Sequence, residues 1–284
     1  MVQRAPERED TMNTKEIMDL ALELAGLKEI PDDSGIIVAG EDIKKVAFGV
    51  DMEAAEMLIA RELGVDLVIT HHPVGGAPRL NLYKVMENQI ERMAAAGVPV
   101  NKAQKALREQ MGKVERSLHV SNYDRAASAA RLLKMPFMGI HSPADVISER
   151  TVQRHLDNSL NPRSTLGDVI EALQQIPEYR NALTKPEIRV GAEKDYAGKV
   201  FVTMAGGTNG GAKVAQAYFE AGIGTLVCMH MPEEVIKAVK EQNIGNVIVA
   251  GHMASDSIGI NVIIAALEER GLEVIRMSGV IDPN

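Results

Sequence analysis

The stretch GVDLVITHHP, residues 64–73, decides how this chain is expected to fold. Its glycine closes a helical pattern over 52–63, an apolar run over 67–69 follows, and two adjacent histidines stand before Pro73. Another apolar run, at 45–50, precedes the helical pattern. Strand, helix and strand in this order form a β-α-β unit, in which the two strands lie parallel. Because both runs are apolar without alternation, we expect a parallel sheet that is covered on both faces.

Strand and helix patterns alternate to the end of the chain, which predicts an α/β fold. A helix, a glycine and LVCMH at 226–230 repeat the order of a helix, a glycine and LVITH at 67–71. We therefore expect two intertwined α/β domains with mostly parallel sheets. The repeat suggests an internal duplication, and chance likeness between β-α-β units is the alternative.

The pattern divides the chain into three parts. An N-terminal α/β half covers 1–147 with a tail at 1–11, a helical connecting region covers 148–185, and a C-terminal α/β half covers 186–284. Helices are predicted at 82–96 and 258–270, among other places.

Composition excludes several classes of protein. The net charge is −8 and the chain has no Trp, five Tyr and four Phe, so a nucleic-acid partner is not expected. No apolar run is long enough to span a membrane, and the charged N-terminus does not resemble a secretory signal. One cysteine, Cys228, cannot form an intrachain disulfide, and inside an apolar run it is expected to be a buried core residue. We expect a cytoplasmic protein.

Residues that bind metals follow directly on the predicted strands. Ligand sites of open parallel sheets lie at the carboxyl ends of the strands, and five of the seven histidines are found there. Imidazole and carboxylate together suit Zn, Fe, Mn or Ni, whereas a single cysteine does not provide a structural zinc site. The candidate residues at strand ends are Asp51, His71, His72, His141, Asp145, His230, His252 and Asp256.

Each of these clusters also has a purely structural interpretation. Adjacent histidines occur by coincidence on surfaces, and Asp145 would serve as the cap of a following helix. His252 and Asp256 are four residues apart, which is also the spacing of ordinary surface pairs on helices. No cluster decides alone, but their common position at strand ends favours a metal site.

A glycine-rich turn, AGGTNGGAK at 205–213, connects a predicted strand to a helix. Free backbone N–H groups and the helix dipole favour an anion at such a turn, with Gly206, Gly207, Gly210 and Gly211 as the candidate residues. The position of Lys213 does not fit a nucleotide-binding P-loop. Tight packing of the turn explains the glycines equally well.

Four motifs in series resemble the Nif-three-like proteins, which are also described as GTP cyclohydrolase I type-two homologues. The stretch 64–73 is similar to that family's strand ending in His-His-Pro, and MGIHSPAD at 138–145 is similar to its His-Thr-x-x-Asp segment. The glycine-rich turn has a counterpart in the family, and AGHMASD at 250–256 resembles its Gly-His-x-x-(Ser/Thr)-Glu motif. The resemblance extends over about residues 36–276.

The resemblance implies a two-domain α/β protein with a dinuclear divalent-metal site between the halves, often assembled as a toroidal homohexamer. The implied ligands are His71, His72, Asp145, His252 and Asp256, with His141 close by. This chain departs from the family at two positions. Asp256 stands where the family has Glu, and His230 stands where it usually has an acidic residue. Asp51 and Glu53 are candidates to orient the imidazoles near the His71 strand.

These features lead to a main expectation and two alternatives. The first is a metal-dependent hydrolase with two divalent ions that acts on a nucleotide-like or phosphorylated small molecule. GTP ring opening is suggested only by the family's label. The second is a non-catalytic metal carrier or a metal-dependent regulatory protein, and the third is an oligomeric scaffold with structural histidines. The sequence assigns no catalytic residue.

Overall fold

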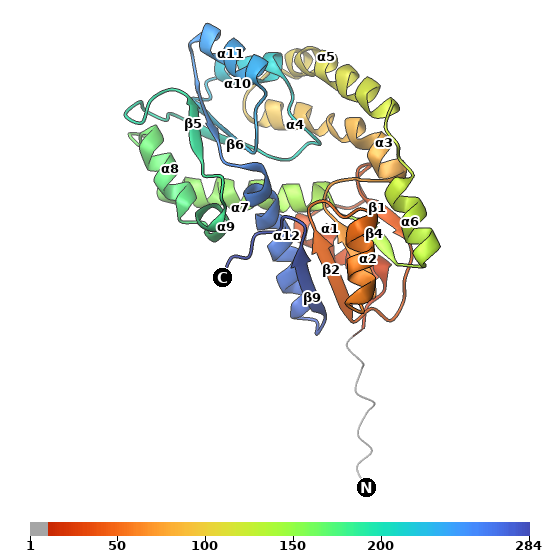
Figure 1. Cartoon of the computed structure of the whole chain (residues 1–284). Helices are drawn as coiled ribbons and strands as arrows, with labels where there is room; N and C mark the ends of the chain where they lie inside the picture. The colour runs from red at the N-terminus through yellow and green to blue at the C-terminus, as the bar shows by residue number, and fades with distance from the viewer. Residues whose placement is uncertain (1–10) are drawn as a thin grey trace.

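The computed structural model describes residues 11–284 and contains two mostly parallel sheets (Figure 1). In the first sheet the strand order is β1 (Gly35–Val38), β4 (Phe137–Gly139), β3 (Leu67–Thr70), β2 (Lys45–Gly49) and β9 (Glu273–Met277). In the second sheet it is β5 (Glu187–Val190), β8 (Asn246–Val249), β7 (Thr225–Cys228) and β6 (Val200–Thr203). The predicted α/β class with mostly parallel sheets is confirmed. The predicted tail lies, except for residue 11, outside the described residues.

The two sheets share one topology apart from the added strand β9. In each sheet, the repeat supplies four strands, β1–β4 or β5–β8. The first of the four, β1 or β5, is an edge strand that pairs antiparallel with the last, β4 or β8, and the other neighbours are parallel. Both antiparallel pairs also carry a register shift at the same place, between Ile36 and Val38 in β1 and between Ile188 and Val190 in β5. A shared strand order with a shared irregularity supports the internal duplication.

The register corrects the alignment of the two repeats by one residue. The last parallel pair is Gly49 with Thr70 in the first sheet and Thr203 with Cys228 in the second. Thr70 therefore corresponds to Cys228, and His230 corresponds to His72 instead of His71.

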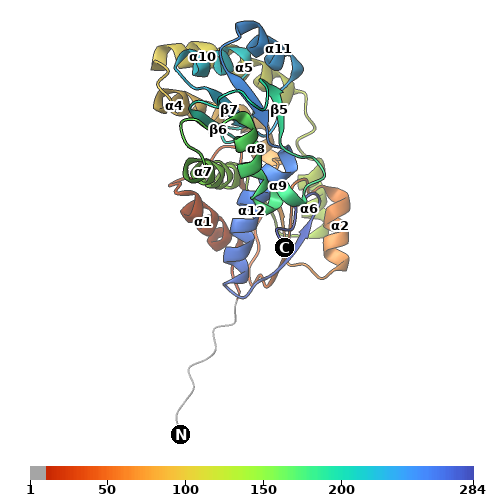
Figure 2. The same cartoon turned by 90° about the vertical axis from the view of Figure 1, so that its left-hand side faces the viewer.

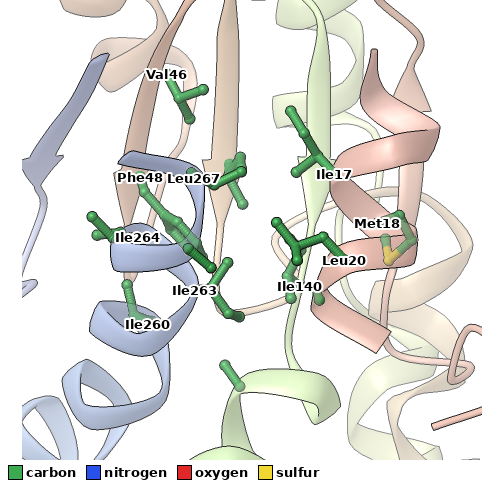
Figure 3. Packing of buried hydrophobic residues seen from close by; sticks show 14 of the residues in the cluster. Ile17, Met18, Leu20, Val46, Phe48, Ile140, Ile260, Ile263, Ile264 and Leu267 are labelled. Carbon is green, nitrogen blue, oxygen red and sulfur yellow. The ribbon is translucent and has the colours of Figure 1, made fainter. Parts of the chain in front are cut away.

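Helices cover both faces of the first sheet. α1 (Thr14–Ala25) and α12 (His252–Glu268) pack on one face, where Ile17, Phe48 and Ile264 belong to one buried cluster (Figure 3). α2 (Ala54–Glu62) and α6 (Arg125–Leu133) pack on the other face. This arrangement explains why the strands are apolar without alternation.

The second sheet is covered in the same way, partly by a segment inserted between β3 and β4. That segment contains α3 (Gly76–Val85), α4 (Asn88–Ala95) and α5 (Val100–His119). Residues of α4 and α5 join a buried cluster with α10 (Ala212–Glu220) and α11 (Glu233–Gln242), so these helices lie together at the top of Figures 1 and 2. The opposite face packs on α7 (Ser142–Ser159), α8 (Leu166–Gln174) and α9 (Pro177–Asn181).

Two helices, α7 and α12, belong to both units. Ile147 of α7 and Ile260 of α12 lie in the core of the first sheet, whereas Val152 and Ile258 lie in a core of the second. The helices cross at Gly259, where an added Cβ would lie 2.0 Å from the carbonyl oxygen of Ala144. Such a contact is possible only because residue 259 has no side chain.

Several boundaries differ from the sequence prediction. The helix expected at 82–96 is divided into α3 and α4, and α12 begins at His252, six residues before the expected start. β9 lies in the segment assigned to the C-terminal half but pairs with β2 of the first sheet. The domain division at 147 and 185 stays a prediction. In the described part of the chain, no helix has the length and hydropathy to cross a membrane.

Replacing Gly259 with Ala is expected to destabilise the protein by about 1–3 kcal/mol or more, because the new methyl group overlaps the backbone of α7. Urea unfolding followed by circular dichroism measures the change. The matched control is Gly112→Ala in α5, where an added Cβ meets only the flexible end of Arg116. That substitution should be neutral or stabilise by about 0.5–1 kcal/mol. Equal behaviour of the two variants would contradict the close helix contact.

Candidate metal centre

The carboxyl ends of strands from both sheets bring the candidate ligands together. His71 and His72 directly follow β3, and His141 follows β4 by one residue. Ile140 and His71 continue the pairing of the strands, since the Ile140 N–H donates to the carbonyl of Thr70 and the His71 N–H donates to that of Gly49. The second sheet contributes His252, at the start of α12.

The inner part of the cluster is fully buried. The Nε2 atom of His71 lies 3.4 Å from Oδ1 of Asp145 and 3.6 Å from Oδ1 of Asp256. Asp145 comes from the first turn of α7 and Asp256 from the second turn of α12, so the helix crossing at Gly259 holds the two carboxylates at one place. Asp145 is therefore part of the helix and does not cap it.

The outer part of the cluster is half open to solvent. The Nε2 atom of His72 lies 3.3 Å from Nε2 of His252, and both lie 3.5 Å from Oδ2 of Asp256. The His252 side chain is 44% exposed, whereas that of Asp256 is completely buried. Asp256 thus presents one oxygen to the inner part and the other to the outer part.

Four buried polar atoms in this cluster have no hydrogen-bond partner among the described residues. They are Nε2 of His71, Oδ1 of Asp145 and both carboxylate oxygens of Asp256. Buried polar atoms are almost always paired, so a converging set of unpaired ones needs a bound group. Imidazole nitrogens and carboxylate oxygens with ligand atoms within 4.8 Å of one another fit divalent ions of the zinc or iron type.

The other nitrogen of each first-sheet histidine is already engaged, which directs Nε2 into the cluster. His71 Nδ1 lies 3.2 Å from the carbonyl oxygen of Ile140, and His72 Nδ1 lies 2.9 Å from Asp51. His141 Nδ1 lies 2.7 Å from Asp33. Such partners fix the ring orientation and raise the basicity of a metal-binding imidazole. His141 Nε2 faces Asp145 at 3.6 Å, at the edge of the cluster.

Asp33 is a residue that the sequence analysis missed. It is completely buried just before β1, and its carboxylate accepts hydrogen bonds from His141 and from the Ser142 hydroxyl. Ser34 beside it accepts the backbone N–H of His141. The sequence around Asp33 indicates only a turn, and the one signal of its role is the antiparallel pairing of β1 with β4, which the sequence does not reveal.

The charges of the cluster stabilise one another. Burial alone would raise the pKa of Asp256, but the neighbouring histidines, above all the charge of His71, outweigh this and hold that pKa well below its usual range. Burial alone would lower the pKa of His71, and Asp256 and Asp145 outweigh this and raise it well above its usual value. Burial lowers the pKa of His252 and of His230. The Asp256 carboxylate is therefore ionised and available to cations.

His230 lies beside the cluster on the second-sheet side. Its ring centroid is 4.8 Å from that of His252, and the residue lines a cavity that adjoins the cluster. The structure thus brings all the predicted residues Asp51, His71, His72, His141, Asp145, His230, His252 and Asp256 to one region, with Asp51 behind His72.

The cavity beside the cluster extends along the glycine-rich turn, and the space between atoms there, open solvent included, is about 750 Å³. Two glycines of the turn pack closely on α4: a Cβ on Gly206 would lie 2.7 Å from Gln89, and one on Gly210 would lie 2.4 Å from it. The Gln89 amide donates hydrogen bonds to the carbonyls of Gly206 and Thr208, both at 2.7 Å. Packing therefore accounts for these glycines, and their role in anion binding stays a prediction.

Comparison with known proteins agrees with this architecture. The profile of the Duf34/NIF3 family (NGG1p interacting factor 3) matches residues 12–103. The crystal structure of a NIF3 superfamily protein from Sphaerobacter thermophilus is 41% identical over 95% of this chain and 99% of that chain, with a TM-score of 0.90. The chain belongs to the NIF3 family. A search of curated proteins gave no match.

More distant solved structures share the fold. Reduced HcgD from Methanocaldococcus jannaschii is 16% identical over 94% of this chain and 98% of that chain, with a TM-score of 0.56. A Bacillus cereus protein related to NIF3 is 12% identical over 94% of this chain and 97% of that chain, with a TM-score of 0.54. At this level of identity the likeness concerns the fold alone.

Replacing Asp33 with Asn is expected to weaken metal binding by about 10–100-fold, because a neutral amide no longer orients and polarises His141. Competition with a chromophoric chelator measures the affinity. The neighbouring Asp32→Asn is the matched control, since Asp32 is exposed and faces only Lys84 at 3.7 Å. The same affinity in both variants would exclude a role for Asp33 in holding the metal-facing imidazole.

Proposed function

We propose that this NIF3-family protein binds two divalent metal ions and hydrolyses a small phosphorylated molecule. The observation that carries the proposal is the set of four unpaired buried ligand atoms on His71, Asp145 and Asp256 beside a cavity. His71, Asp145 and Asp256 would hold the inner ion, with His141 as a further ligand at its edge, and His72, His252 and Asp256 would hold the outer one. Bound in pairs, such ions supply a water of lowered pKa and a Lewis acid for an oxyanion.

The protein's own residues would orient the reactants. Asp51 and Asp33 hold His72 and His141 in position, and the buried carboxylate of Asp256 connects both parts of the cluster. A wide cleft lined by Arg79, Arg125 and His72 lies on the solvent side of the cluster. Since His141, His230 and His252 line both spaces, a ligand that enters by the cleft would reach the cluster before the inner cavity.

A non-catalytic metal carrier is the second candidate. The observation that favours it is the exposure of His252, whose side chain is 44% exposed at the edge of the outer part. An ion at this position would exchange with solvent ligands more readily than one held by completely buried His71 and Asp256. The homohexamer implied by the family resemblance stays a prediction that light scattering would test.

Metal content tests the proposal directly. Untagged wild-type protein should contain about two metal equivalents by plasma mass spectrometry. Asp256→Asn should lose both, because Asp256 faces both parts of the cluster, whereas His252→Ala should lose about one. His119→Ala is the control, since His119 is exposed at the end of α5 and should keep both.

Turnover then separates the two candidates. The metal-loaded protein should hydrolyse at least one member of a panel of phosphate monoesters and nucleotides, and Asp256→Asn should not. Bound metal without turnover of any member would favour the carrier. Absence of metal in every preparation, with a melting temperature that chelators leave unchanged, would refute the metal centre and favour a scaffold.

A further inference from the structure

A single arginine, Arg92 of α4, lines the cavity beside the cluster. It belongs to the segment inserted between β3 and β4, but it faces the second sheet. Its side chain is 23% exposed, so most of the guanidinium group is removed from water. Burial of a charge is costly unless the charge is paired, which makes its partners informative.

The partners of Arg92 leave part of its hydrogen-bonding capacity unused. One terminal nitrogen forms an ion pair with Glu149 of α7, whose other oxygen accepts the backbone N–H groups of Met204 and Ala205 at 2.9 and 3.0 Å. Glu149 thus fixes the arginine to the start of the glycine-rich turn. The Nε–H group of Arg92 is buried and has no partner in the described part of the chain. Guanidinium has five N–H donors, so this ion pair does not saturate it.

The charged residues around the cavity indicate how many negative charges a bound ligand can carry. Of the residues that line it, Arg92 is the one lysine or arginine, and the carboxylates Asp145 and Asp256 face the metal cluster. The rest of the wall is mixed: apolar residues such as Val214 and Leu226 lie beside polar residues of the glycine-rich turn, such as Thr208 and Asn209. Tyr218 is the one Phe, Tyr or Trp in this wall, so stacking support for a purine is weak.

We propose that the cavity binds a small organic acid with one phosphate or carboxylate group on a compact body, and that Arg92 binds the acidic group. The metal end of this proposal rests on the function proposed above. One arginine with unused N–H donors matches one acidic group. A nucleoside triphosphate brings several negative charges and a base, for which the wall offers no further lysine or arginine and one aromatic ring, Tyr218. Arginine suits this task because its planar group binds phosphate and carboxylate through two parallel hydrogen bonds.

Calorimetric binding of phenyl phosphate, benzoate and GTP tests the proposal. Zinc-loaded and metal-stripped wild-type protein would each be titrated, together with Arg92→Gln, Arg92→Lys and Lys213→Gln. Lys213→Gln is the matched control, because it removes the same charge from α10, the helix next to the turn. The Lys213 side chain is 63% exposed and pairs with Glu109.

Wild-type protein should bind phenyl phosphate or benzoate more tightly than GTP. Arg92→Gln should weaken that binding about tenfold or more with unchanged metal content, since a charged hydrogen-bonding partner is lost. Arg92→Lys should weaken the binding less, because lysine keeps the charge and the ion pair with Glu149. This variant also tests the proposal if Arg92→Gln does not fold. Lys213→Gln should bind as the wild type does.

The outcomes separate this proposal from the function on which it rests. Arg92-dependent binding to protein that takes up no metal would refute the metal centre and leave the acid site standing. Normal metal content with binding that is the same in wild type and both folded Arg92 variants would refute the acid site alone. Tighter binding of GTP than of either small acid, or no binding of either small acid to the wild type, would also overturn the acid site.

Discussion

The close crossing of α7 and α12 is the constraint on which the rest of the structure depends. At Gly259 the two helices touch without an intervening side chain, and the Ser148 hydroxyl donates to the carbonyl of Ser255 and accepts the N–H of Gly259. Asp145 follows directly on the contacted residue Ala144, and Asp256 lies within one turn of Gly259. Two carboxylates from helices of different repeats therefore meet in the interior, an arrangement that is costly unless cations neutralise it.

The surrounding residues offset the free-energy cost of burying the two carboxylates. His71 lies against both carboxylates, and the Nδ1 atoms of the first-sheet histidines are bound by groups outside the cluster, so their Nε2 atoms remain available. The same helices supply apolar residues to both sheets, which couples the position of the carboxylates to both cores. Loss of one contact in α12 would therefore change both the position of the carboxylates and the stability of the fold.

The sequence predicts the part of this arrangement that depends on local pattern. Apolar runs, closing glycines and ligands at strand ends identify the parallel sheets and the residues His71, His72 and His252 without any knowledge of contacts. Asp33 and Arg92 are not accessible in this way, because their meaning comes from partners far along the chain. Asp33 faces a histidine 108 residues later, and Arg92 faces a glutamate of another helix. The early start of α12 was missed for a related reason: a helix buried on nearly all sides lacks the polar face on which periodicity depends.

The two repeats keep the same topology but have diverged in what they contribute. Each ends in a strand followed by a helix that has a histidine and an aspartate near its start, His141 with Asp145 and His252 with Asp256. The register, in which Ile140 corresponds to Ala250, places the second pair one residue later than the first. At the middle strand they differ, because His71 of the first repeat corresponds in register to Met229 of the second. An apolar residue here removes a ligand and adds to the cavity wall, which the inserted helix α4 completes with Arg92. Duplication therefore gave a shared frame of strands and helices, in which the two carboxylates occupy neighbouring and not equivalent positions. Divergence of one strand end made one side of that frame a ligand cluster and the other side a pocket.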